Sequence, residues 1–296
     1  MLDLSHIPNS QQDIKIFYSN GVLNSWQTWQ KPRKCQWVWI MCIGGAGGGA
    51  GGNAAVTTNG SSGGASGGST RAIFNASHLP DTLYIQVGLG GNGGASNTNG
   101  SGGVRSFISI LPNNTSTNGV LASGTNNTSG GGGLTTGAAV AGEVAFTITP
   151  AVFGSLSTFL STQGVQSALS ALSPTNITPL TSQITSPGAQ GAGYNTTTPA
   201  AINGASIVAS NLSPLISGGV GTIAAATDGG NGADGMTSWK PFFSTGGAGG
   251  GNSRFGVGGN GGKGGIGSGG GAGGSSGVTG GRGGNGGDGV VVIVAF

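Results

Sequence analysis

The sequence predicts a mainly β protein, with a β-sandwich or jelly-roll-like core of strands and glycine-rich segments of the polyglycine-II type. Two observations lead to this prediction. Apolar residues gather in short runs, and the 68 glycines of the 296-residue chain gather between those runs. Toward the end of the chain, glycine also recurs in a strict Gly-Gly-X triplet register. Many short strands separated by glycine-rich turns are typical of sandwiches and barrels.

The runs expected to form strands are short and are bounded by turn signals. Asn20-Gly21, for example, ends the first run with a dipeptide that is typical of a hairpin turn. In chain order, we expect strands at 14–18, 25–30, 36–43, 69–74, 83–87, 104–110 and 290–296. The core would be closed by joining the first and last parts of the chain.

The run at 36–43 is apolar on both of its faces. Alternation places two sets of residues on opposite faces: Trp37, Trp39, Met41 and Ile43 on one, and Val38, Ile40 and Cys42 on the other. A strand of this kind belongs in the centre of a sheet, where both faces are covered. Four of the five tryptophans lie between Trp26 and Trp39. A sugar-stacking platform is one interpretation of this cluster, but its apolar neighbours favour a place in the core.

The run at 290–296 has the same two-sided apolar character and also needs a central place. Its expected partner is the strand at 36–43. The structural residues that we single out in the two strands are Trp37, Trp39, Ile43, Val290, Val292 and Phe296.

Residues 111–235 differ from the rest of the chain because they are rich in Ser, Thr, Asn and Ala. Within them, 142–149 has the pattern of one more strand, and 155–172 has a loose helical spacing of apolar residues that predicts a short helix. We therefore divide the chain into three parts: N-terminal strands with the first glycine-rich loops at 1–110, an insertion or subdomain at 111–235, and a glycine-rich segment with the closing strand at 236–296.

The densest glycine lies in two triplet blocks. Their leading glycines are Gly258, Gly261 and Gly264 in the first block and Gly280, Gly283 and Gly286 in the second. A period of three matches a helix of the polyproline-II type, which has three residues per turn. Because its glycine edges are bare, neighbouring helices can approach closely and bond through their backbones, so that several segments form a slab. The alternative is a flexible Gly/Ser linker, but the triplet register and the apolar strands favour order.

The charge content excludes several classes of protein. The chain has 10 basic and 7 acidic residues, a net charge of +3, and scattered basic residues, which argues against nucleic-acid binding. Its longest apolar run is far shorter than the ~20 residues that a membrane-spanning helix needs, so membrane insertion is not expected. The first residues lack the basic and apolar regions of a secretory signal.

Catalytic, cofactor-binding and metal-binding sites are not expected either. The chain has two His, and its few carboxylates are widely separated, which leaves no base–nucleophile set and no cluster of metal ligands. Matches to Gly-x-Gly-x-x-Gly follow from the abundance of glycine, and none lies in a strand–loop–helix unit. Cys35 and Cys42 lie too far apart along one strand to form a disulfide with each other. We therefore expect two reduced thiols, no cofactor and no enzymatic activity.

Three segments carry a resemblance to a known group of proteins. These are the strand that leads into 44–52, the run 79–94 with its Val-Gly-x-Gly-Gly-x-Gly-Gly pattern, and the ending Gly-Gly-Asp-Gly-Val-Val-Val-Ile at 286–293. In these segments the chain resembles the glycine-rich domain proteins of bacteriophages and related viruses, which occur in tail fibres, fibre-tip adhesins and other virion appendages. The resemblance covers about 30–110 and 236–296 and leaves out the insertion.

The resemblance implies that packed polyglycine-II helices display loops that touch a host surface, and that the protein resides in the virion. We therefore expect a structural protein on the particle surface, of the tail-fibre/adhesin or capsid-decoration type, that acts in host attachment. The implied partners are other virion proteins, further copies of the chain (a trimer is one option), and a host surface glycan or outer-membrane protein. Loops within 111–135 and 190–204 are the expected contact regions.

A second class of function stays open: a non-viral glycine-rich structural, matrix or ice-binding protein. An ice-binding face would require regularly repeated Thr or Ala. The third positions of the triplets are instead Asn, Lys, Ile, Arg, Asn and Asp, which argues against ice binding.

Overall fold

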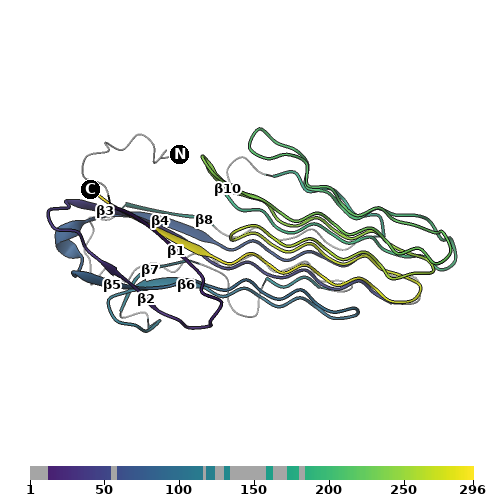
Figure 1. Cartoon of the computed structure of the whole chain (residues 1–296), viewed down its shortest axis with the longest axis horizontal. Coiled ribbons are helices and arrows are strands. Elements are labelled where there is room, and N and C mark those ends of the chain that lie inside the picture. The colour runs from purple at the N-terminus through teal and green to yellow at the C-terminus, as the bar shows by residue number, and fades with distance from the viewer. Residues whose placement is uncertain are drawn as a thin grey trace.

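The computed structural model describes residues 13–54, 59–115, 118–123, 130–133, 158–162, 172–179 and 184–296. These residues are mainly β, as the sequence predicts, and their helical structure is limited to a 3-10 turn, η2 (Ala76–His78). Figure 1 shows the strands gathered at one end, from which glycine-rich segments run away side by side. The sheets and the glycine-rich segments therefore occupy different ends of one elongated body.

The larger sheet has five strands in the order β1-β11-β3-β4-β8, and every neighbouring pair is antiparallel. The bounds are Asp13–Tyr18 for β1, Val290–Ala295 for β11, Trp37–Ile43 for β3, Ser69–Asn75 for β4 and Thr158–Thr162 for β8. Val290 lies opposite Ile43, and Val294 lies opposite Trp39. The predicted pairing of the two strands that are apolar on both faces is thus confirmed.

The second sheet has the order β2-β5-β6-β7, and a separate hairpin pairs β9 with β10. The bounds are Gln27–Gln30 for β2, Thr82–Gln86 for β5, Ser106–Ser109 for β6, Gly119–Ser123 for β7, Thr237–Trp239 for β9 and Phe242–Ser244 for β10. Strands β7, β9 and β10 were not predicted from the sequence. Their apolar runs are only one to three residues long, which is too short to show an alternating pattern.

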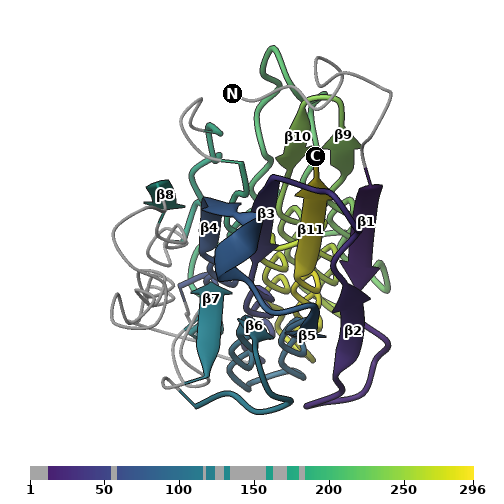
Figure 2. The ribbon, with the colours of Figure 1, turned by 90° about the vertical axis from the view of Figure 1, so that its left-hand side faces the viewer.

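One apolar core joins the two sheets (Figures 1 and 2). It contains Val38 and Ile40 from β3, Leu83 and Ile85 from β5, and Trp29 from β2, each at most 2% exposed. A second cluster covers the opposite face of the larger sheet. Its buried members are Met41, Ile43, Ile184, Val290, Val292 and Val294. Strands β3 and β11 are therefore covered on both faces, as predicted.

The tryptophans divide between the interior and the surface. Trp29 is in the core, as we expected for the cluster, and Trp39 is half-buried against the second apolar cluster. Trp37, at the start of β3, is 39% exposed. The expectation of a buried cluster is therefore wrong for Trp37, because that residue is the first of β3 and lies outside the apolar cluster that covers the rest of this face.

The helix predicted for 155–172 is wrong where the structure describes it. Thr158–Thr162 is strand β8, which pairs antiparallel with β4. The edge of β4 supplies backbone partners for an extended segment, and the β-branched threonines at both ends of β8 suit a strand. The strand predicted at 142–149 lies outside the described residues.

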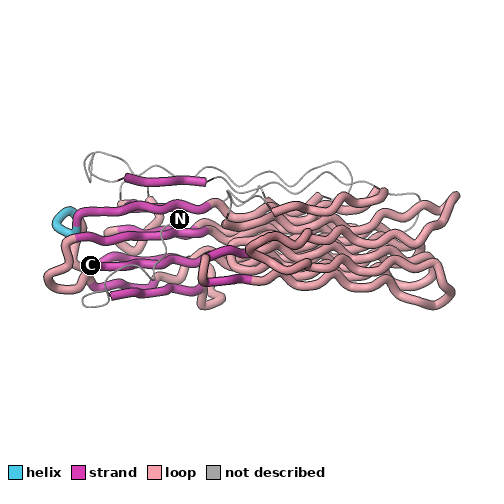
Figure 3. The backbone as a smooth tube through the Cα atoms, turned by 90° about the horizontal axis from the view of Figure 1, so that it is seen from above, coloured by secondary structure: helices cyan, strands magenta, loops and turns pink. Residues whose placement is uncertain are grey.

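Several strands continue directly into glycine-rich segments. β3 runs into segment 44–53 and segment 279–289 runs into β11, so two neighbours in the sheet begin two neighbouring segments. Figure 3 shows the segments as wavy tubes side by side, and Figure 2 shows their coils from the sheet end. The described part of the Ser/Thr/Asn-rich insertion from 184 onward also runs among these segments and bonds to them.

Candidate functional site

Segment 44–53 shows how the glycine-rich part is built. Its N–H groups donate to three neighbouring segments in turn, and the cycle repeats every third residue. The first two cycles run at 2.9–3.0 Å from Gly44, Gly45, Ala46, Gly47, Gly48 and Gly49 to the carbonyl oxygens of Gly68, Val104, Gly287, Ala65, Ser101 and Gly284. Its own carbonyls accept hydrogen bonds from segments 88–95, 130–133 and 267–276. The segment is thus surrounded, and all of its residues are buried.

Segments 267–276 and 244–253 are enclosed in the same way. Together with 44–53 they form the middle layer of a slab, in which Gly270 donates to Gly47 O and Gly250 donates to Ala272 O. A repeat of three with bonds to different neighbours is the geometry of polyglycine-II packing. The glycine-rich segments therefore have a core made of backbone, and the flexible-linker alternative does not describe them.

The predicted glycine positions lie in the layer next to this middle layer. A Cβ on Gly258, Gly261 or Gly264 would overlap the carbonyl oxygen of Gly274, Gly271 or Ser268. A Cβ on Gly280, Gly283 or Gly286 would overlap the carbonyl oxygen of Gly52, Gly49 or Ala46. Segment 279–289 is thus pressed against segment 44–53, and only the third residue of each triplet has room for a side chain.

Those third residues form a regular array on the outer face of the slab. Backbone N–H groups of segment 257–266 donate to side chains of segment 228–237, always at a separation of 29 residues. The four bonds, at 2.7–3.0 Å, run from Val257 to Asp228 Oδ1, from Asn260 to Asn231 Oδ1, from Lys263 to Asp234 Oδ1 and from Ile266 to Thr237 Oγ1. We call this outer surface of segments 228–237, 257–266 and 279–289 the ladder face.

The ladder continues across the next two segments. Arg282 N–H donates to Asn260 Oδ1 at 2.8 Å. Farther on, Gly93 N–H donates to Asn285 Oδ1 at 2.9 Å. Gly90 N–H donates to Asp288 Oδ1 at 2.7 Å. Each of these side chains accepts a hydrogen bond from an N–H group that has no carbonyl partner at the surface of the slab.

This role of the Asn and Asp residues was not predicted from the sequence. The triplet register singled out the glycines, and the third positions served only to argue against an ice-binding face. The signal was available: Asp228, Asn231, Asp234 and Thr237 also follow a period of three, and all four carry a short side chain with an acceptor oxygen. Which N–H group each oxygen accepts from depends on the packing of separate segments.

The turns at the far end of the slab carry exposed apolar side chains. Bridges join Ser253 to Ser276 and Thr222 to Ser253, so the turns that follow these residues lie at the same end. The exposed side chains there include Ile223, Phe255 and Val278, at 44%, 48% and 57% exposure. We call the turns at 223–227, 254–256 and 277–279 the distal tips.

Of the predicted contact loops, 195–201 turns at this far end, and Asn195 Oδ1 accepts from the N–H groups of Thr197 and Thr198. The described residues 110–115 and 118 belong instead to the connection between β6 and β7, at the sheet end. Residues 130–133 of the first predicted region run in the slab, where Gly133 O accepts from Ser62 N–H, next to the Ser61 carbonyl that accepts from Gly191 N–H.

A family model described as Glycine-rich domain matches residues 21–296. The chain belongs to this glycine-rich domain family. No curated protein matches the chain significantly.

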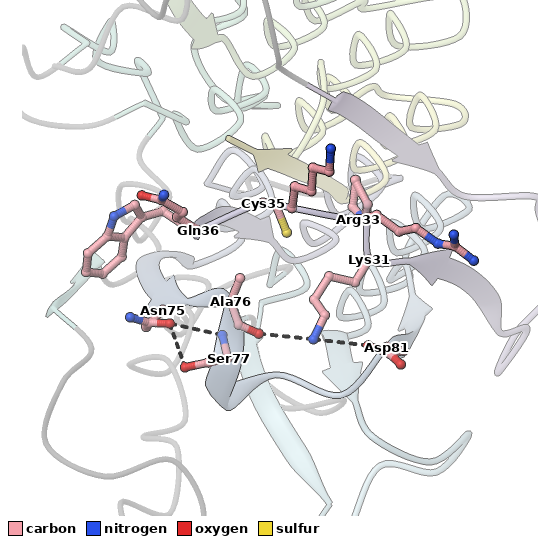
Figure 4. A pocket seen from close by; sticks show the side chains of 11 residues that line it. Lys31, Arg33, Cys35, Gln36, Asn75, Ala76, Ser77 and Asp81 are labelled. Atoms are coloured by element: carbon pink, nitrogen blue, oxygen red, sulfur yellow. Dashed lines mark hydrogen bonds and ion pairs between the residues drawn. The ribbon is translucent and has the colours of Figure 1, made fainter.

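At its sheet end, the glycine-rich domain protein has an open pocket of about 710 Å³ between the β2–β3 loop and η2 (Figure 4). Lys31 Nζ donates to the carbonyls of Ala76 (3.1 Å) and Leu79 (2.7 Å) and pairs with Asp81 at 3.2 Å. The Lys31 charge therefore stabilises the end of η2. Arg33 points away from Ala76 in Figure 4, so the basic residues of the loop do not converge on a common point.

Among the described residues, no group of three or more His, Cys, Asp or Glu side chains could hold a metal ion. Cys35 and Cys42 form no disulfide within these residues, and the Cys42 thiol donates to the Ser106 carbonyl at 3.6 Å. Burial lowers the pKa of the Arg71 guanidinium on β4, which lies outside the pocket and away from the ladder face. Within the same residues, no helix has the length and apolar character needed to cross a membrane.

Proposed function

We propose that this glycine-rich domain protein is a structural protein on the surface of a viral particle, of the tail-fibre/adhesin or capsid-decoration type, and that it acts in host attachment. The observation that carries the proposal is the enclosed backbone core of the slab. A slab whose middle segments bond on all sides is a stiff arm, and it presents the distal tips away from the sheets.

The chemistry of the distal tips supports a passive contact role. Phe255 and Val278 are exposed at the same end, and the Arg254 guanidinium lies over the Phe255 ring at 4.6 Å. Exposed aromatic and Arg side chains are enriched at the centres of protein interfaces. In the pocket at the sheet end, the Lys31 ammonium is already bonded to Ala76 O, Leu79 O and Asp81, so it serves the fold there.

The experiment that tests particle residence is proteomic analysis of density-purified virions, combined with immunogold labelling. The proposal expects the chain at a fixed ratio to the capsid protein and gold on the outside of the particle. Recovery only from a cell or matrix fraction would overturn it and favour a non-viral glycine-rich structural protein.

Attachment is tested by competition. The purified chain should reduce adsorption of particles to host cells, and Phe255→Ser together with Val278→Ser should weaken this competition. Val22→Ser together with Leu23→Ser is the matched control, since both side chains are exposed, at 61% and 56%, in the loop between β1 and β2 and outside the predicted contact loops. Equal competition by all three proteins would remove the distal tips from the proposal.

A further inference from the structure

The amide side chains of the ladder face are fixed in orientation. Asn231, Asn260 and Asn285 each accept a backbone hydrogen bond through Oδ1. Among the described residues, the Nδ2 group of each of the three has no hydrogen-bond partner, and all three side chains are exposed. Because Oδ1 is held, each Nδ2 group is a donor whose position is set before any ligand arrives.

Two cationic donors lie among these amides. Lys263 follows Asn260 by one triplet, and Arg282 precedes Asn285 by one triplet. Both side chains are exposed, and neither forms an ion pair within the described part of the chain. Successive third positions along one segment are about 9.3 Å apart, since three residues rise 3.1 Å each. Donors therefore repeat along each segment and from one segment to the next.

We propose that the ladder face binds a neutral, hydroxyl-rich polysaccharide that lies across segments 228–237, 257–266 and 279–289. Fixed amide donors lose little side-chain freedom on binding, which favours even weak contacts to sugar hydroxyls. The donors of this face are exposed and are spread over three segments, so an extended polymer suits it better than a monosaccharide. The neighbouring carboxylates of Asp228, Asp234 and Asp288 supply acceptors and disfavour an acidic polymer.

This inference names a glycan partner for the proposed attachment function and rests on that function only for the source of the glycan. It adds a contact surface separate from the distal tips. The tips present apolar side chains suited to a protein receptor, whereas the ladder face presents polar donors.

The test separates the two roles of each asparagine. The triple variant Asn231→Asp, Asn260→Asp and Asn285→Asp keeps Oδ1 and removes the Nδ2 donor. The fold should tolerate this change, because Asp228, Asp234 and Asp288 already accept the same kind of bond. The control Asn20→Asp, Asn75→Asp and Asn176→Asp changes the charge equally at side chains that also accept a backbone hydrogen bond through Oδ1 but lie outside the ladder face.

Binding is measured by affinity electrophoresis in gels that contain dextran, amylose, galactomannan or, as the acidic comparison, alginate. We expect the protein to be retarded by at least one neutral polymer, with binding about tenfold weaker in the ladder variant, as for the loss of about one net hydrogen bond, and unchanged in the control. Retardation by none of the neutral polymers, or equal retardation of both variants, would overturn the inference. If the neutral polymers retard the native protein and the ladder variant equally while the tip variant loses competition for host cells, the attachment proposal stands and the glycan inference fails.

Discussion

On the ladder face, one backbone N–H group lacks the side-chain acceptor that its neighbours have. Asn260 accepts from Arg282 N–H, 22 residues later. The same offset relates Lys263 to Asn285, but a Lys side chain cannot accept a hydrogen bond. Accordingly, Asn285 N–H has no partner among the described residues. Lys263→Asn should supply the missing acceptor.

The expected gain is about 0.5–1.5 kcal/mol, the net value of one hydrogen bond that replaces a bond to water. It corresponds to a rise in the unfolding midpoint of roughly 1–4 °C for a domain of this size. Lys263→Ala is the control, because it removes the charge and adds no acceptor. Asn260→Ala is the reciprocal variant and should lose a similar free energy.

The assay is reversible denaturant unfolding followed by circular dichroism, with thermal unfolding as a second measurement. The order of stability should be Lys263→Asn above Lys263→Ala, and the native protein above Asn260→Ala. If Lys263→Asn and Lys263→Ala were equally stable, an acceptor oxygen at a third position would not stabilise the slab, and the reasoning would be refuted.

Three other outcomes follow from the same structure. Gly49→Ala should lower the free energy of unfolding by about 3 kcal/mol or more, because the added Cβ would overlap the backbone of Gly271 in the enclosed layer. Denaturant unfolding measures this loss, and a loss of less than about 1 kcal/mol would contradict the prediction. Ile293→Ala should cost about 2–5 kcal/mol, since Ile293 is fully buried in the core between the sheets, whereas Val278→Ser at a distal tip should change stability by less than about 0.5 kcal/mol. A broad-specificity protease should leave 244–276 uncut except at the exposed turn of Phe255, as read by mass spectrometry; rapid cleavage throughout would mean that the glycines are tethers.

Agreement between sequence and structure is strongest where one segment carries the whole signal. The two-sided apolar character of 36–43 and 290–296 predicted central strands, and β3 and β11 are central. Disagreement arises where a neighbour decides. The apolar spacing in 155–172 by itself favours a helix. Thr158–Thr162 is nevertheless a strand, because its backbone pairs with the edge of β4.

The candidate site divides in the same way. The glycine positions of the triplets were predictable, because a period of three implies close backbone contact. The role of the third positions as hydrogen-bond acceptors was not predictable, because Asp228 and Val257 lie 29 residues apart in the sequence and meet only through the packing of two segments. Likewise, the exposure of Phe255 and Val278 at one end depends on which turns lie together.

By itself, the sequence determined the mainly β class, the central strands and the three-residue repeat. These are properties of short stretches of chain: alternation sets the faces of a strand, and bare glycine edges set the packing period. The tertiary structure alone decided which segments are neighbours, which N–H groups reach the surface and which side chains bond to them. The physical reason is that glycine carries no side chain that could specify a partner, so the partners follow from the sheet order and from the turns between segments.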